Sequence, residues 1–283
     1  MPPTPQLRFG ILCEGTTFRE WQASCIQRLM ALEGVKPALL IIDSRPPLPP
    51  KPLIKRFGTL LRLRVNFFSL YSRYYVKWQA LASQPVDLSG GLKEVPRIRC
   101  EVTKKGKFSE YFNPQDIAAI RDHNLDFLLR FGFNIIRGDI LTLPRYGVWS
   151  FHHGDEQYYR GAPPCFWEIY RGEPYTGLIL QRLTERLDGG VVLKKARFPT
   201  ISHSYAANRD AAHYQGISWP AEVCRDIFNG IAGYLDEPPS KTAAPIYKEP
   251  TNTEMIQFAW KQLGNVSAHY LHPKRNCGAM VQK

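Results

Sequence analysis

The side chains best suited to chemistry lie between Ser150 and Asp188. His152 and Asp188 stand thirty-six residues apart, and the stretch 159–164 between them reads Tyr-Arg-Gly-Ala-Pro-Pro. A neutral imidazole takes a proton from an attacking amine, and a carboxylate orients that imidazole and stabilises its charged form. Glycine and proline at this density are typical of an irregular loop that shapes a site. The pattern predicts acid–base chemistry in which His152 and Asp188 act together.

This region resembles the family of formyltransferases that use 10-formyltetrahydrofolate. Arg160 and Gly161 follow His152 at the family's spacing of eight residues, and Asp188, with two glycines after it, stands where the family has Asp-x-Gly. The resemblance is specific from about residue 126 to 193 and weaker over 9–43. It implies an enzyme that moves a formyl group to an amine, with His152 and Asp188 as catalytic residues.

One position departs from the family pattern. Ser150 stands where the family has an asparagine whose amide holds the formyl oxygen as negative charge develops on it. Losing one such donor typically costs about 3 kcal/mol of transition-state stabilisation. The resemblance therefore leaves three alternatives: Ser150 is the oxyanion donor, His153 beside it supplies the hydrogen bond, or the chemistry is altered.

The resemblance also implies binding residues. The co-substrate 10-formyltetrahydrofolate is expected against the loops 131–143 and 183–188. The residues expected to contact it are Phe131, Gly132, Phe133, Leu183 and Leu187. The residues expected to contact the acceptor are His153, Tyr159, Arg160 and Gly161. Arg160 either binds an anionic part of the acceptor or braces its loop. The aromatic rings beside the site either stack on the folate or the acceptor or pack in the protein: Tyr158, Tyr159, Phe166 and Trp167.

The elements that must position these residues form a predicted α/β fold. Apolar runs at 7–13 and 38–43 flank a helical pattern at 18–32, which makes a strand-helix-strand unit with parallel strands. A strand at 147–152 delivers His152 to the carboxyl edge of the sheet, where open α/β sheets bind ligands. We predict a Rossmann-like, mostly parallel sheet flanked by helices, with a mainly helical C-terminal extension.

The expected domain organisation has two parts. Residues 1–200 form the catalytic domain, with a basic helical insertion at about 45–111, and residues 201–283 form a helical and extended C-terminal extension. In that extension, a last helix is expected at 253–263 and a loose tail from His269.

Positive charge is concentrated in the insertion. The chain has a net charge of +12, and residues 45–111 hold fourteen Lys/Arg against four Asp/Glu. Helical spacing over Lys55–Ala82 predicts a long helix. Its apolar face would hold Phe57, Leu61, Phe68, Tyr71 and Tyr75, and its cationic face Lys55, Arg62, Arg73 and Lys77. The helix either covers the sheet or rests on an anionic membrane surface, a phosphate or a partner.

Several classes of protein are disfavoured. The chain has no apolar run long enough to cross a membrane and no secretory leader pattern, so a cytoplasmic protein is expected. Its six cysteines form no Cys-x-x-Cys pair, so they are expected as reduced thiols without a zinc site. The turn after the first strand lacks G-x-G-x-x-G, which argues against a nicotinamide enzyme.

The acceptor is expected to be the amine of a small molecule, such as a nucleotide- or lipid-linked amino sugar. The alternating strands of the family's tRNA-specific β-barrel are not seen in the sequence, which disfavours tRNA. Three alternatives stay open: a formyltetrahydrofolate hydrolase, an inactive folate- or nucleotide-binding relative, and a basic nucleic-acid-binding protein. The oligomeric state is also open.

Overall fold

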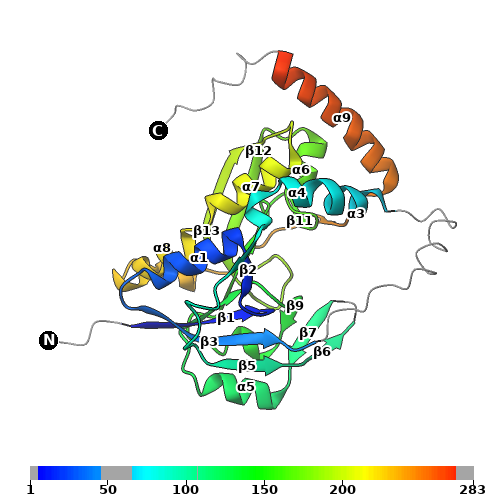
Figure 1. Ribbon diagram of the computed structural model, residues 1–283. Coiled ribbons are helices and arrows are strands. Elements are labelled where there is room, and N and C mark those ends of the chain that lie inside the picture. The colour runs from blue at the N-terminus through cyan, green and yellow to red at the C-terminus, as the bar shows by residue number, and fades with distance from the viewer. Residues whose placement is uncertain (1–5, 46–65, 107, 272–283) are drawn as a thin grey trace, which may run out of the picture.

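A computed structural model describes residues 6–45, 66–106 and 108–271, and its centre is a seven-stranded sheet (Figure 1). The order across the sheet is β13-β12-β10-β8-β1-β3-β5. In chain order these strands are β1 (Leu7–Cys13), β3 (Val35–Asp43), β5 (Arg97–Cys100), β8 (Phe127–Arg130), β10 (Val148–His152), β12 (Tyr175–Arg182) and β13 (Val191–Pro199). Only β12 runs antiparallel to its neighbours. The predicted mostly parallel α/β sheet is confirmed.

The first strand lies where the strand order reverses. From β1 the chain passes through α1 (Glu20–Met30) to β3 on one side, and later returns to β8 on the other side. The helix begins two residues later than the sequence pattern predicts, because Thr17–Arg19 forms the short strand β2 against β4 (Pro85–Asp87). The Gln22 side chain then caps α1 by accepting a hydrogen bond from the backbone N–H of Arg19, at 3.0 Å.

Smaller elements surround the seven-stranded sheet. A three-stranded sheet consists of β6 (Val102–Lys105), β7 (Ser109–Phe112) and β9 (Ile135–Arg137). The short strands β11 (Arg160–Gly161) and β14 (Ile246–Tyr247) pair with each other. The remaining short elements are α5 (Pro114–Arg121), α6 (Phe166–Arg171) and the 3-10 helices η2 (Leu81–Ser83), η3 (Asp139–Leu141) and η4 (Gly233–Asp236). The β11–β14 pair ties the candidate site loop to the C-terminal part of the chain.

Apolar clusters cover both faces of the sheet. One face packs against α1 and α8 (Trp219–Phe228), and the other against α5. A third cluster lies beyond the end of the sheet, among α6, α7 (Tyr205–Gln215) and α9 (Asn252–Leu271). Helices after residue 200 therefore share apolar cores with elements before it.

The predicted basic helix is confirmed only in part. Residues 55–65, which include Lys55, Phe57, Leu61 and Arg62, lie outside the described residues. The rest forms α3 (Phe67–Tyr71), the π-helix η1 (Ser72–Val76) and α4 (Lys77–Gln79).

The described part of this segment packs mainly on α6, α7 and α9, so for this part the alternative of a helix that covers the sheet does not hold. Its buried face also changes within η1. Tyr75 is 51% exposed whereas Val76 is fully buried, because a π turn holds one residue more than an α turn and shifts the inward positions.

The last helix is longer than predicted. Thr251 and Glu254 form a capping box at its start, with the Thr251 N–H donating to the Glu254 carboxylate at 2.7 Å. The helix continues through His269, where the sequence suggested a loose tail. The part of the helix beyond residue 263 contacts the segment before α7: Asn265 donates a hydrogen bond to the Ser202 carbonyl at 3.0 Å, and His269 stacks on His203.

Candidate active site

Strand β10 delivers two of the predicted catalytic side chains. Side chains alternate along a strand, so Ser150 and His152 share one face of β10 and Phe151 lies on the other. Ser150 is buried at 2% exposure, and His152 stands at the carboxyl end of the strand. The predicted strand at 147–152 is thus confirmed, and it carries both residues to one place.

Asp188 reaches this place by a loop that folds back. Arg182, the last residue of β12, lies opposite Trp149, near the start of β10, so the loop 183–190 must return along β10 to reach His152. Asp188 has φ of 48°, a left-handed conformation that aspartate tolerates better than most residues. The Gly161 N–H donates to Asp188 Oδ2 at 2.9 Å. Backbone strain at a residue held in this way is a common property of functional sites.

Arg160 braces the same loop. Its guanidinium donates to the carbonyl of Leu187 at 2.6 Å and to the carbonyl of Ala244 at 3.2 Å. Of the two roles that the sequence left open for this arginine, these contacts favour bracing. The loop that holds Asp188 is therefore connected through Arg160 to the C-terminal part of the chain.

The neighbours of His152 fix which ring nitrogen is basic. Nε2 lies 2.8 Å from the carbonyl oxygen of Tyr159, which only accepts hydrogen bonds, so Nε2 carries the hydrogen. Nδ1 lies 3.7 Å from Asp188 Oδ1. In the neutral ring the lone pair is on Nδ1, and an imidazolium formed there has the carboxylate beside it. The arrangement suits a base whose charged form is stabilised by Asp188.

Ser150 is held by an arginine that sequence reasoning missed. Arg130 Nε donates to Ser150 Oγ at 3.1 Å, and its Nη1 donates to the carbonyls of Asn134 and Phe133 at 2.8 and 3.3 Å. Burial lowers the pKa of Arg130, while the carboxylates of Asp188 and Glu110 raise it, and an arginine stays charged in either case. The sequence shows only a cation at the end of the apolar strand β8, and this feature alone does not separate a buried arginine from an exposed one.

The hydrogen bond that Ser150 Oγ accepts from Arg130 decides what the serine hydroxyl can do with its own hydrogen. Because Oγ already accepts from a cation, its own hydrogen is left to donate. In the structure that hydrogen has only a long contact, 3.4 Å to the carbonyl of Phe151. A formyl oxygen near Ser150 would offer a better acceptor.

His153 lies apart from Ser150. Its ring packs among Trp21, Phe151 and His213, at centroid distances of 5.3, 6.1 and 4.2 Å. Burial, reinforced by His213, holds the pKa of His153 well below its usual range, so the ring is neutral. The geometry favours Ser150 over His153 as the donor to an oxyanion.

The other predicted acceptor residues serve the local structure. The Tyr159 carbonyl binds His152, and its hydroxyl donates to Glu173 at 2.8 Å. Phe166 and Trp167 are buried in the cluster around α6, so their rings pack and are not free to stack on a ligand. The ring of Tyr158 is exposed and lies under the Arg197 guanidinium.

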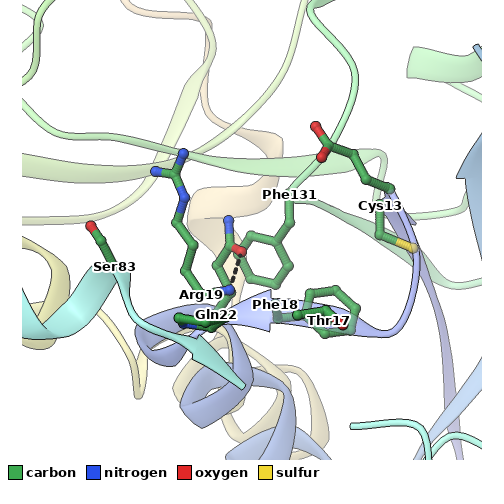
Figure 2. A pocket seen from close by; sticks show the side chains of 9 residues that line it. Cys13, Thr17, Phe18, Arg19, Gln22, Ser83 and Phe131 are labelled. Carbon is green, nitrogen blue, oxygen red and sulfur yellow. Dashed lines mark hydrogen bonds between the residues drawn. The ribbon is translucent and has the colours of Figure 1, made fainter. Parts of the chain in front are cut away.

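Two of the five predicted folate-binding residues border hollows in the surface. Phe131 borders a hollow of about 290 Å³ together with Arg19 and Ser83 (Figure 2). Leu183 borders a second hollow of about 600 Å³, which parts of both predicted folate loops line, including Gly138–Asp139 and Thr184–Glu185.

The other three predicted folate-contacting residues, Gly132, Phe133 and Leu187, pack or form hydrogen bonds within the protein. Gly132 packs against the backbone of Cys13, where a Cβ would come within 2.8 Å of it. Phe133 packs on Phe112 at 5.0 Å, and Leu187 contributes its carbonyl to Arg160.

Gly161→Ala is expected to destabilise the fold more than a second glycine replacement does. Gly161 has φ of +87°, and a Cβ there would lie 2.2 Å from the Tyr247 carbonyl oxygen. Gly172 has φ of +76° with no atom near such a Cβ, so Gly172→Ala carries only the backbone penalty of about 1–2 kcal/mol. Denaturant unfolding of both variants measures the difference. Equal losses would contradict the close approach of β14 to the site loop.

The described residues were also compared with the requirements of a metal site and of a membrane-spanning helix. Within residues 6–45, 66–106 and 108–271, no three His, Cys, Asp or Glu side chains gather in a way that would hold a metal ion. Over the same ranges, no helix combines the length and the apolar character needed to cross a bilayer.

The sequence has clear relatives among curated proteins, although no protein-family model matches it. It is 29% identical over 166 residues to the methionyl-tRNA formyltransferase of Agathobacter rectalis, covering 58% of this chain and 49% of that protein. It is 33% identical over 151 residues to that of Caldanaerobacter subterraneus, covering 53% and 48%. The chain thus spans about half the length of the curated relatives it matches.

Solved structures share the fold. The phosphoribosylglycinamide formyltransferase of Anaplasma phagocytophilum has a TM-score of 0.50 at 16% identity, covering 79% of this chain and 87% of that one. An N-formyltransferase of Helicobacter canadensis, solved with folinic acid and dTDP-3-aminofucose, has a TM-score of 0.50 at 9% identity, covering 91% and 81%. At these identities the likeness is one of fold.

Proposed function

We propose that this chain, a relative of the formyltransferases in sequence and fold, transfers a formyl group from 10-formyltetrahydrofolate to the amine of a small molecule. One observation carries the proposal. A basic imidazole nitrogen, a carboxylate beside it and a buried hydroxyl lie together on β10 and its neighbouring loop. Amine formylation needs a base for the amine proton, a partner for the cation formed and a donor for the oxyanion.

In the proposed reaction, the neutral amine nitrogen attacks the formyl carbon and the carbonyl electrons move onto oxygen. The Ser150 hydroxyl donates a hydrogen bond to that oxygen, and such a bond is strongest once the negative charge has formed. The amine proton passes to His152 Nδ1, and Asp188 stabilises the imidazolium. When the intermediate collapses, the bond from the formyl carbon to N10 of the folate breaks. His152 returns the proton to N10, which leaves formylated amine and tetrahydrofolate.

Tyr159 and Gly161 act through other residues in this scheme. The Tyr159 carbonyl keeps the hydrogen of the neutral ring on Nε2, and the Gly161 N–H holds the Asp188 carboxylate toward Nδ1. Both are backbone groups of one loop, which explains how a short segment sets the tautomer and the orientation of the base together.

The folate is proposed to bind in the hollow of about 600 Å³ beside Leu183. Both loops expected to contact it contribute to the lining, and a concave site of this size suits a small ligand. The Helicobacter canadensis enzyme was solved with folinic acid, a reduced folate.

Calorimetry with 5-formyltetrahydrofolate is expected to show saturable binding to the wild type. Leu183→Asp should weaken that binding at least about tenfold, because it puts a charge against an apolar part of the ligand. The matched control is Leu32→Asp, at a half-buried leucine that packs against the apolar cluster on the other face of the sheet. Absence of binding to the wild type at millimolar ligand would remove the folate assignment.

The acceptor is proposed to be a small amine, and a product screen tests this. The chain is incubated with 10-formyltetrahydrofolate and a panel that includes nucleotide-linked and lipid-linked amino sugars, methionyl-tRNA and a sample without amine. Formylated amino sugar, found by mass spectrometry, supports the proposal. Formyl-methionyl-tRNA would move the acceptor to the class named for the curated relatives. Tetrahydrofolate release without amine would indicate a hydrolase, and folate binding without turnover an inactive relative.

A further inference from the structure

The helical segment 67–81 is apolar on two opposite sides. Its inner side packs on α7 and α9 through Phe68 and Val76, among others. Its outer side shows a second set at helical spacing: Phe67, Leu70, Tyr74, Trp78 and Leu81. Trp78 is 77% exposed. Large apolar side chains gathered in the open on one side of a helix mark an interaction surface, so this outer side is a surface that something covers.

Helix α9 repeats the arrangement. Met255 and Phe258 face inward and are buried. Its outer side carries large exposed side chains, again at helical spacing: Ile256, Trp260, Leu263, Tyr270 and Leu271. Trp260 is 72% and Tyr270 74% exposed. The two outer stripes belong to one unit of structure.

Direct contacts join the two helices. The rings of Tyr71 and Phe258 lie 5.9 Å apart, and the Phe67 N–H donates to the Asn252 side chain at 2.9 Å. Figure 1 places α3, α4 and α9 on the same side of the molecule, away from β5 and α5. We call the ten outer residues of the two stripes the aromatic surface.

The sequence stretches that contain these two helical segments are strongly basic, and the structure describes Arg73 and Lys77 of the first stretch and Lys261 of the second. Residues 46–83 contain seven Lys/Arg and no Asp/Glu, and residues 252–283 contain four Lys/Arg and one Glu. Ten of the twelve net positive charges therefore belong to these two stretches. Arg73 lies over the Tyr74 ring, 5.7 Å from its centroid, so cation and aromatic ring are interleaved.

From this combination we infer that the aromatic surface rests on the face of an anionic lipid bilayer. Tryptophan and tyrosine favour the level of the lipid headgroups, leucine and isoleucine enter the acyl boundary, and Lys/Arg attract anionic lipids. The surface is an adsorbing one and does not span the bilayer. This inference is independent of formyl transfer, because none of these side chains belongs to the candidate active site.

Other occupants fit less well. A second copy of the chain would bring the same excess of positive charge to the interface and be repelled. Single-stranded nucleic acid would suit the cations and the rings, but aliphatic side chains such as Leu70, Ile256 and Leu263 offer it no stacking partner.

Co-sedimentation of the full chain with vesicles tests the inference. Phosphatidylcholine vesicles containing phosphatidylglycerol are expected to carry the wild type down at low salt, and vesicles of phosphatidylcholine alone to bind at least about tenfold less, since each cation near an anionic surface adds to the affinity. Raising the salt should weaken binding to the anionic vesicles. The fluorescence of Trp78 and Trp260 should shift to the blue on binding.

Paired variants separate the apolar and the charged contributions. Trp78→Gln with Trp260→Gln, and separately Arg73→Gln with Lys77→Gln, should each lower vesicle partitioning about tenfold. Matched controls make the same kinds of change elsewhere: Tyr175→Gln with Ile231→Gln for exposed apolar residues, and Lys36→Gln with Lys93→Gln for charge. The controls should change partitioning less than about twofold, because their positions lie off the surface.

Three results would overturn the inference. The first is no sedimentation of the wild type with anionic vesicles at low salt. The second is an equal loss of vesicle partitioning in the surface variants and in their controls, which would attribute the binding to the net charge of the chain and not to this surface. The third is a dimer in gel filtration that Trp260→Gln abolishes while vesicles bind nothing, which would assign the surface to a second copy.

Discussion

His152→Ala should lower the rate of formyl transfer at least about a hundredfold, the usual scale for a general acid–base group. The loss follows from the position of Nδ1, which is the nitrogen free to take the amine proton. Asp188→Asn should cost a similar factor, because the amide keeps the shape of the carboxylate but no longer stabilises an imidazolium. The measurement is turnover with the amine that the product screen identifies.

The control for this pair is a histidine outside the site. His123→Ala removes an imidazole from a surface turn after α5 and should leave turnover within about twofold, as surface changes away from a site usually do. Both site variants should keep the wild-type unfolding midpoint to within a few degrees, since neither side chain fills an apolar core. If both site variants turned over within about threefold of the wild type, the chemistry would have to be assigned to other residues.

The parts of the fold that the sequence predicted are those in which local pattern and burial agree. β1 and β3 are short runs of apolar residues buried on both sides of the sheet. The strand that carries Ser150 and His152 was found for the same reason. Their presence on one face followed from strand alternation alone.

Other features depend on partners far away in the chain. β2 and β14 are two or three residues long and exist only because β4 and β11 pair with them. The π turn at 72–76 changes the buried face within a helix, which regular spacing does not anticipate. Burial against α7 and α9 decides which side of that segment is the inner one.

In the candidate site, too, some features follow from the local sequence and others depend on distant contacts. His152 and Asp188 were predicted to act together from residue type and spacing, and the structure places them side by side. The tautomer of His152 depends on the Tyr159 carbonyl, which has no side-chain signature. Arg130 was missed because nothing local distinguishes a buried arginine at a strand end from a surface one. Its role came from a contact with Ser150, twenty residues later in the chain.

That contact leads to the second large effect, which concerns how a serine replaces the family's asparagine. Ser150→Ala should lower turnover by about a hundredfold or more and change the affinity for 5-formyltetrahydrofolate less than about threefold, because the hydrogen bond is strongest once the charge has formed. Arg130→Met should also lower turnover, since Ser150 would lose the cation that orients and polarises its hydroxyl.

A double-mutant cycle tests whether Arg130 and Ser150 act as one unit or independently, by comparing the turnover of the two single variants with that of the double variant. If Arg130 acts through the hydroxyl, the double variant should lose little more than Ser150→Ala alone, whereas independent residues would multiply their losses. Arg130 also binds the carbonyls of Phe133 and Asn134, so its variants must be compared for unfolding free energy as well. Arg130→Lys keeps the charge but has no planar fork to serve the serine and the carbonyls together, and should recover only part of the turnover. A Ser150→Ala chain as active as the wild type would remove the hydroxyl from the mechanism, and multiplied losses in the double variant would detach Arg130 from it.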